Sequence, residues 1–286
     1  MATFLPLAHW SASERQGLLG VFTDIDDTLT TDGAITPDAL AALGELKAAG
    51  LHVIAITGRP VGWSEPFAAT WPVDAIVAEN GAVSLERDGN GGLRKRYMQD
   101  AATRRSNFAR MQAVAAQVLA AVPGATLAQD SVGRETDIAI DHSEFTQLPP
   151  DQITQAVRLM HAAGMNATVS SIHINGWFGQ HNKWVGAQWI ARELLGRDLT
   201  PEVNRWAYVG DSTNDQLMFQ AFAHSIGVAN VRRFEEQLSH APRYITPSER
   251  GAGFAEISRA ILAARPDRPA TPLPHAADPG HSADRD

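Results

Sequence analysis

Two aspartates, Asp24 and Asp26, follow a short apolar run and are the residues of this chain best placed to do chemistry. The run Leu18–Thr23 is typical of a buried strand, so both acids lie where that strand ends. If extended geometry continues, their side chains project the same way, and like charges held that close repel unless a cation or a shared proton separates them. Ligand crevices of open α/β sheets lie beyond the carboxyl ends of their strands. The spacing predicts a metal site with a nucleophile; a solvated acidic loop before a helix is the alternative.

The composition limits the classes of protein that this chain can belong to. Its 286 residues exceed the usual size of one domain, so two domains are expected. The apolar share of 44% is typical of a globular protein. A formal charge of −8 argues against nucleic acid or an anionic membrane as a partner, while still allowing a small anionic ligand. The chain has no cysteine, which excludes disulfides, thiolate catalysis and cysteine-ligated metal.

The ends of the chain carry no targeting signal that we can identify. Residues 1–10 lack a basic start and make a poor signal peptide, and no run of eighteen apolar residues predicts a membrane span. We therefore expect a cytoplasmic enzyme. Residues 265–286 are rich in Pro, Asp, His and Ala, a composition that predicts a disordered tail.

The first third of the chain alternates strands and helices. Strand-like runs at 18–23, 51–56 and 75–78 enclose a helix over 37–49, which Pro37 suits at its first turn and Gly50 ends. This βαβαβ order is typical of a parallel sheet covered on both faces. Thr36 is the expected N-cap of the helix.

The pattern changes after residue 89 and resumes at Lys183. Helical spacing over 106–122 and 150–163 alternates with paired strand-like runs, which gives the order αββαββ of a separate α/β module. The runs expected as strand pairs are 125–131 with 136–141 and 167–172 with 173–178. The predicted division is a core formed by residues 1–88 and 180–264, an inserted module over 89–179, and the tail 265–286.

Polar groups suited to phosphoryl transfer follow four of these elements. Besides Asp24 and Asp26, they are Thr57, Lys183 and the pair Asp211 and Asp215. Parallel topology would bring these ends to one edge of the sheet. A carboxylate can attack phosphorus, a divalent cation offsets the repulsion between the two anions, and Mg²⁺ prefers such hard oxygen ligands.

Taken together, these four segments resemble the four motifs of the haloacid dehalogenase-like (HAD) phosphohydrolases. Their order and spacing are similar to the subfamily with a type IIB cap, which includes Cof-like phosphatases and sucrose- and mannosylglycerate-type sugar phosphatases. The similarity covers about residues 20–262. It implies a Rossmann-like α/β core, a parallel sheet with helices on both faces, and an inserted, mobile α/β cap.

The resemblance also implies a role for each motif residue. Asp24 corresponds to the nucleophile and Asp26 to the general acid and base. Phosphate binding is implied for four residues: Thr57, Gly58, Lys183 and Asn214. Mg²⁺ ligands are implied at Asp24, Asp211 and the main-chain carbonyl of Asp26, with Asp215 supporting the metal. At position 27, where the family commonly has Gly, this chain has Asp, which tolerates a left-handed backbone better than most residues.

The cap of such an enzyme meets the leaving group and should set specificity. Candidate substrate contacts, each with a structural alternative such as an ion pair, a plain turn or a packed ring, are Arg59, Asn80, Arg134, His173, Asn175 and Trp177. The resulting prediction is a Mg²⁺-dependent phosphomonoesterase for a small phosphorylated metabolite, with a sugar phosphate favoured. A phosphomannomutase-like isomerase remains an alternative, and a non-catalytic phosphoester-binding protein is a weaker one.

Overall fold

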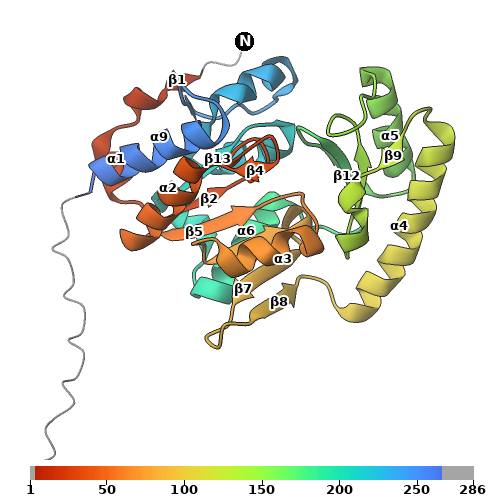
Figure 1. Ribbon diagram of the computed structural model, residues 1–286, viewed down its shortest axis with the longest axis horizontal. Coiled ribbons are helices and arrows are strands. Elements are labelled where there is room, and N and C mark those ends of the chain that lie inside the picture. The colour runs from red at the N-terminus through yellow and green to blue at the C-terminus, as the bar shows by residue number, and fades with distance from the viewer. Residues whose placement is uncertain (1–3, 266–286) are drawn as a thin grey trace, which may run out of the picture.

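The computed structural model describes residues 4–265 and contains two sheets, each with its own helices (Figure 1). The larger sheet has nine strands and carries both ends of the described chain. The smaller sheet has four strands and lies with α4 and α5 to one side of the larger one (Figure 1). We call the first part the core and the second part the cap. No helix of residues 4–265 combines the length and the apolar character that crossing a membrane requires.

The strands are two to five residues long. The strands of the large sheet are β1 Leu5–Pro6, β2 Gly20–Thr23, β5 His52–Ile56, β6 Ala75–Ala78, β7 Val83–Arg87, β8 Leu93–Tyr97, β13 Trp206–Gly210, β14 His224–Gly227 and β15 Tyr244–Ile245. The cap strands are β9 Thr126–Leu127, β10 Ile138–Asp141, β11 Asn166–Val169 and β12 His173–Trp177. A two-stranded hairpin consists of β3 Thr30–Thr31 and β4 Ala34–Ile35.

The α-helices are α1 Ala12–Gln16, α2 Pro37–Ala48, α3 Val61–Thr70, α4 Ala101–Ala121, α5 Pro150–Ala162, α6 Lys183–Leu195, α7 Leu199–Glu202, α8 Gln216–Ala221 and α9 Arg250–Ala263. Short 3₁₀ segments are η1 Leu7–His9, η2 Glu79–Gly81, η3 Gln129–Gly133, η4 Val203–Arg205, η5 Thr213–Asp215 and η6 Ala229–Gln237.

The strand order of the large sheet places β2 beside β13 and β5. The full order is β1-β15-β14-β13-β2-β5-β6-β7-β8, parallel from β1 to β6 and antiparallel at β7 and β8. Because neighbouring parallel strands end at the same edge, the loops after β2, β13 and β5 meet there. The expected parallel α/β core is therefore confirmed.

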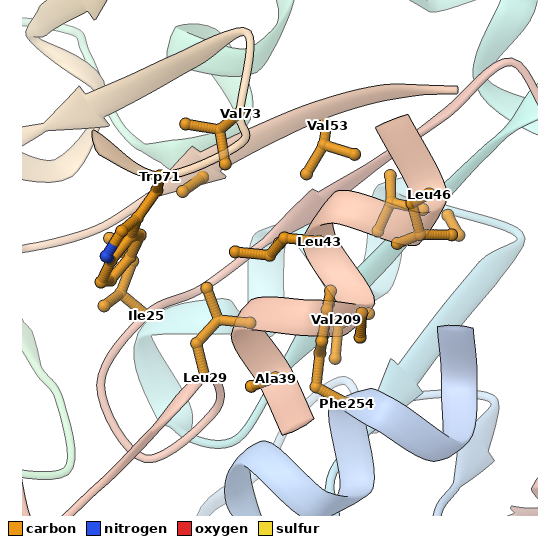
Figure 2. Packing of buried hydrophobic residues seen from close by; sticks show 14 of the residues in the cluster. Ile25, Leu29, Ala39, Leu43, Leu46, Val53, Trp71, Val73, Val209 and Phe254 are labelled. Carbon is orange, nitrogen blue, oxygen red and sulfur yellow. The ribbon is translucent and has the colours of Figure 1, made fainter. Parts of the chain in front are cut away.

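Apolar side chains of the core alternate between the two faces of the sheet, as strand geometry requires. On one face, Val21, Val53 and Val209 pack against α2 and α9, and Figure 2 shows Leu43 and Phe254 from these helices among them. On the other face, residues such as Phe22 and Tyr208 pack against α6 and α8. The sheet is thus buried on both sides, which fixes the positions of its strand ends.

The cap has a separate apolar cluster. Its sheet has the order β11-β12-β10-β9 and is antiparallel throughout. Helices α4 and α5 cover one face, where Met111, Met160 and Ile174 are fully buried. A Cβ atom at Gly176 of β12 would come within 2.7 Å of the sulfur of Met160, so a larger residue there would displace the Met160 side chain.

Several boundaries differ from the sequence-based expectation. Strand β8 pairs with β7 in the large sheet, so residues 93–97 extend the core beyond the expected boundary at residue 88. The expected strand over 125–131 is only β9, followed by η3, whose Gly133 lies against the Cα atom of Gly62 in α3. The Thr36 side chain makes no capping hydrogen bond. The predicted tail lies outside the described residues from 266 onward.

Candidate active site

Three buried carboxylates converge at the edge where β2 and β13 end. Asp24 follows β2, Asp211 follows β13, and Asp215 ends η5. One oxygen from each lies within 4.8 Å of the others. The three residues are between 0% and 4% exposed, so bulk water does not screen their charges. The convergence predicted from the topology is therefore present.

Lys183 supplies the compensating positive charge at this edge. It is the first residue of α6, where the Asn182 side chain caps the helix by accepting a hydrogen bond from the amide of Val185, 2.9 Å away. Its Nζ donates to Asp24 Oδ1 at 2.6 Å and to Asp215 Oδ1 at 2.7 Å. Burial lowers the pKa of Lys183, but the two carboxylates outweigh burial and raise it above its ordinary value. The side chain is thus a fixed ammonium between two acids.

Asp215 is fully used by hydrogen bonds within the protein. Its Oδ1 accepts from Lys183 and from the hydroxyl of Tyr208, while its Oδ2 accepts from the amides of Asp211 at 2.9 Å and Ser212 at 3.1 Å. Both oxygens of Asp215 are thus engaged by neighbouring groups of the protein. A supporting role for Asp215 at a metal site stays a prediction.

Asp211 has one oxygen that is held and one that has no partner. Oδ2 accepts a hydrogen bond at 3.0 Å from Asn230, whose Nδ2 also donates to the carbonyl of Asp27 at 2.9 Å. Buried Oδ1 has no hydrogen-bond partner among the described residues. A buried, unpartnered carboxylate oxygen is costly unless a ligand satisfies it. The Asp211 Oδ1 atom is therefore suited to a cation.

The electrostatics of these acids also fit a cation. Burial raises the pKa of Asp24 to about 8, with Asp215 and Asp26 adding to the rise and Lys183 opposing it. Burial likewise raises the pKa of Asp211 well above its ordinary value, and Asp24 and Asp215 add to the rise. A divalent cation reverses this effect because it stabilises the ionised carboxylates. The hard oxygen donors match the ligand preference of Mg²⁺.

Sequence reasoning missed Asn230 and Tyr208. Asn230 lies in η6 beyond β14, and the rule that identified Asp24, a polar residue after a buried strand, would have drawn attention to it. Tyr208 lies inside β13 and belongs to the apolar cluster. Nothing in the sequence distinguishes its hydroxyl from that of an ordinary core tyrosine.

Asp26 lies at the rim of the site and is bound by Arg59. The Arg59 Nε atom is 2.9 Å from Asp26 Oδ1 and 3.1 Å from Oδ2. Arg59 also contacts Asp130 and Glu144 of the cap, at 3.1 Å and 2.8 Å. The sequence analysis allowed either a substrate contact or an ion pair for Arg59, and the structure shows ion pairs.

The loop after β5 brings Thr57 and Gly58 to the same edge. The buried Thr57 Oγ1 accepts a hydrogen bond from the Arg59 amide at 3.0 Å. Asn80 adopts φ +57°, and its backbone amide donates to the Thr57 carbonyl at 2.9 Å. This hydrogen bond holds the loop after β5 in place. Its side-chain Nδ2 donates to Asp137 at 3.2 Å, so Asn80 has a structural role in this conformation.

Position 27 has the left-handed backbone that the Gly-to-Asp difference implied. The φ angle of Asp27 is +53°. Its Oδ1 lies 3.0 Å from Nε of Arg250, which itself has φ +54°. The carboxylate at position 27 thus gains an ion-pair partner at the backbone position where glycine would be unstrained.

Of the cap residues that we expected to contact substrate, two reach the site and two do not. His173 and Asn175 line a cavity of about 10 Å³ together with Asp24, Asp26, Gly58 and Asn214. Arg134 is buried and bound to Asp137 at 2.7 Å and to the Gly58 carbonyl at 3.0 Å. Trp177 packs in the cap cluster and donates to the His181 carbonyl at 2.8 Å. In this conformation these last two residues make the contacts that the structural alternative describes.

A larger cavity of about 550 Å³ adjoins Asp26 and Arg59. Its other lining residues are Asp27, Thr30, Asp32, Gly33, Ser143, Glu144, Phe145, Ser171, Ile172, Arg233 and Arg250. Core and cap both contribute, so the cavity lies between them. Its volume is in the range of small-molecule sites.

A core of this topology with an inserted cap and an acidic strand-end site resembles the HAD hydrolases, and comparisons with known proteins find the same similarity. Residues 21–118 match the family model of the haloacid dehalogenase-like hydrolases. A Streptococcus pyogenes serotype M6 protein named "putative phosphatase" is 22% identical over 271 residues, covering 84% of this chain and 96% of that protein. Over residues 21–118 the chain is thus similar to the haloacid dehalogenase-like hydrolases.

Solved structures share the fold across nearly their whole length. The crystal structure of Thermoplasma acidophilum 0175 has a TM-score of 0.64 at 15% identity and covers 86% of this chain and 99% of that one. The sucrose-phosphatase of Synechocystis, solved with sucrose and phosphate, has a TM-score of 0.62 at 16% identity, with 85% and 98% covered. At these identities the likeness concerns the fold of core and cap.

Proposed function

We propose that this chain is a Mg²⁺-dependent phosphomonoesterase that hydrolyses a small phosphorylated metabolite, a sugar phosphate, through an aspartyl-phosphate. The observation that carries the proposal is the placement of Asp24, a buried carboxylate held 2.6 Å from Lys183 and beside the unpartnered oxygen of Asp211. Asp26 stands at the rim between this group and the larger cavity. The groups that we assign as nucleophile, cation ligands and second acid therefore lie along one edge.

Asp24, Asp211 and the main-chain carbonyl of Asp26 are the groups that would hold Mg²⁺. When bound, the cation supplies positive charge that offsets the repulsion between the carboxylates and the phosphoryl oxygens. Lys183 adds a fixed positive charge from the protein on the other side of Asp24. Thr57, the Gly58 amide and Asn214 are the further donors that we assign to the phosphoryl oxygens.

The two aspartates carry the covalent steps. A carboxylate oxygen of Asp24 forms a bond to phosphorus while the bond from phosphorus to the leaving oxygen breaks, and Asp26 gives its proton to that oxygen. In the second step, the Asp26 carboxylate removes a proton from water as the water oxygen bonds to phosphorus. The bond from Asp24 to phosphorus then breaks, which releases phosphate and restores both side chains.

The chemistry of the larger cavity favours a sugar as the leaving group. Hydroxyls of Ser143 and Ser171 and carboxylates of Asp27 and Asp32 line it, all of which can hydrogen-bond to sugar hydroxyls. Phe145, 64% exposed, offers an apolar surface for a ring face. The fold relatives that act on sugars, such as the sucrose-phosphatase, support this choice.

The same cavity argues against the mutase alternative. A mutase must hold a second phosphate, which requires free cationic groups. Arg233 pairs with Glu249 at 2.7 Å, and Arg250 pairs with Asp27 and Asp32 at 3.0 and 3.1 Å. Arg59 is occupied by three carboxylates. With these arginines paired to acids, the lining suits an uncharged polyol.

The test is phosphate release from p-nitrophenyl phosphate and from a panel of sugar phosphates with Mg²⁺. Asp24→Asn should abolish release because an amide cannot form the acyl-phosphate, while the exposed helix-start variant Asp38→Asn should keep wild-type activity. Substantial turnover by Asp24→Asn would disprove the assignment of the nucleophile. Interconversion of sugar 1-phosphate and 6-phosphate without release of phosphate would identify a mutase.

A further inference from the structure

Arg59 joins the core to the cap through every arm of its guanidinium group. Nε binds Asp26 of the core, Nη1 binds Asp130 of η3 at 3.1 Å, and Nη2 binds Glu144 of the loop after β10 at 2.8 Å. The side chain is 6% exposed, and its guanidinium carbon lies 5.0 Å from the ring centre of Trp63 in α3. A planar fork with contacts along three directions has its orientation fixed.

The two cap partners of Arg59 are themselves held in place. Asp130 accepts from Arg134 Nη2 at 3.1 Å, and Glu144 lies 2.8 Å from His173 Nε2. Burial raises the pKa of Glu144, but the bonds from His173 and Arg59 outweigh it and lower that pKa to about 2. Both cap acids are therefore part of a rigid polar arrangement when they meet Arg59.

The described conformation is a closed one. The cavity beside Asp24 measures about 10 Å³, which is about the space of one water molecule. A phosphorylated substrate needs more room, so the cap must move away from the core for binding. Such a movement withdraws Asp130 and Glu144 from Arg59 and leaves only Asp26 and Trp63 to orient it.

We propose that Arg59 is a positioning residue that sets the Asp26 carboxylate in its working orientation only when the cap is closed. This inference rests on the proposed function, because Asp26 is its general acid and base. In the open state, Arg59 has lost two of its three ionic partners, so its side chain is less constrained. The Asp26 carboxyl that it binds is then less constrained as well. Closure returns the two cap acids and fixes both side chains, so proton transfer is coupled to enclosure of the substrate.

The consequence for catalysis depends on the basicity of the leaving group. A weakly basic leaving oxygen departs with little help from an acid, whereas a more basic one requires the proton of Asp26. A well-placed general acid contributes about 10²–10⁴-fold to the rate. A small displacement of that acid removes much of this acceleration. Loss of the cap acids should therefore slow a substrate with a basic leaving group most.

The kinetic test uses the double variant Asp130→Asn with Glu144→Gln and two aryl phosphates of similar size. The phenolate anion is a stronger base than the p-nitrophenolate anion. For phenyl phosphate we expect kcat to fall about tenfold more than for p-nitrophenyl phosphate, with KM little changed. Arg59→Lys should behave likewise, because an ammonium cannot bind three carboxylates in one plane. The control pair Asp151→Asn with Glu236→Gln removes two exposed acids elsewhere and should leave both rates unchanged.

A second measurement does not depend on activity. The chain has no cysteine, so Gln117→Cys in α4 and Ala48→Cys in α2 give two unique labelling sites on exposed positions. The distance distribution between labels should broaden or lengthen when the cap acids are replaced. Equal loss on both aryl phosphates, or no loss, would overturn the inference, as would an unchanged distance distribution. A wild-type protein that releases no phosphate would instead refute the proposed function, while the distances would still show whether Arg59 and its two cap acids hold the cap against the core.

Discussion

Acidification should destabilise this protein through His181, a buried residue between cap strand β12 and the start of α6. The side chain is 2% exposed, and neither ring nitrogen has a hydrogen-bond partner among residues 4–265. Its ring stacks on Trp177 with a centroid distance of 5.5 Å. Burial lowers the pKa of His181 to about 4 from its ordinary value of 6.5.

The sign of the effect follows from where the proton binds. Between these two pKa values the unfolded chain binds a proton at His181 and the folded chain does not. The contribution of uncharged His181 to the free energy of unfolding is fully present above about pH 6.5. It is lost as the pH falls toward the pKa of His181 in the folded chain. At about 1.4 kcal/mol per pH unit, the whole difference is about 3 kcal/mol, of which about 2 kcal/mol is lost by pH 5.

Urea unfolding at pH 8 and pH 5 measures this loss. The free energy of unfolding of His181→Phe should fall by about 2 kcal/mol less than that of the wild type over the same interval, because phenylalanine keeps a ring against Trp177 and cannot be protonated. The exposed residue His161 provides the matched control, since His161→Phe should retain the wild-type difference. The same difference in all three proteins would refute the reasoning.

Two further outcomes test other parts of the site. Asn230→Ala removes the donor to Asp211 and to the Asp27 carbonyl, so a Mg²⁺ titration should show a higher concentration for half-maximal activity; an unchanged midpoint would contradict the role of Asn230. Trp177→Phe leaves the His181 carbonyl without its donor, so urea unfolding should show a loss of about 1–3 kcal/mol. The ranking of phosphate substrates should not change in that variant. An altered ranking would indicate that Trp177 contacts the substrate.

The core was predictable because its signals are local. Strands β6 and β13 are apolar throughout and β5 is apolar after His52, and α2 and α6 end close to glycines with positive φ, Gly50 and Gly196. Such apolar runs are typical of strands in a parallel sheet that is covered on both faces. Asp24, Thr57 and Asp211 followed, since each comes directly after a strand of this sheet.

The cap was less predictable because its local structure depends on distant partners. Residues 129–133 form η3 where a strand was expected; there Gly133 lies against Gly62, and the neighbouring Arg134 binds the Gly58 carbonyl. These contacts join segments that are about seventy residues apart in the chain, and no periodicity encodes them. The role of Trp177 stayed open for a related reason, since a tryptophan in a buried strand and one lining a sugar site look alike in sequence.

The Asp at position 27 shows how a departure from a family pattern can be accommodated. A left-handed backbone at a non-glycine residue costs about 1–2 kcal/mol, and Asp27, Asp32 and Arg250 all adopt one. The same three residues form an ion-pair triple and line one wall of the larger cavity. Glycine at position 27 would relieve strain there but would leave Arg250 with only Asp32, whose side chain is 88% exposed. The cost at Asp27 is thus offset by a partly buried ion pair, which places a carboxylate where the leaving group would lie.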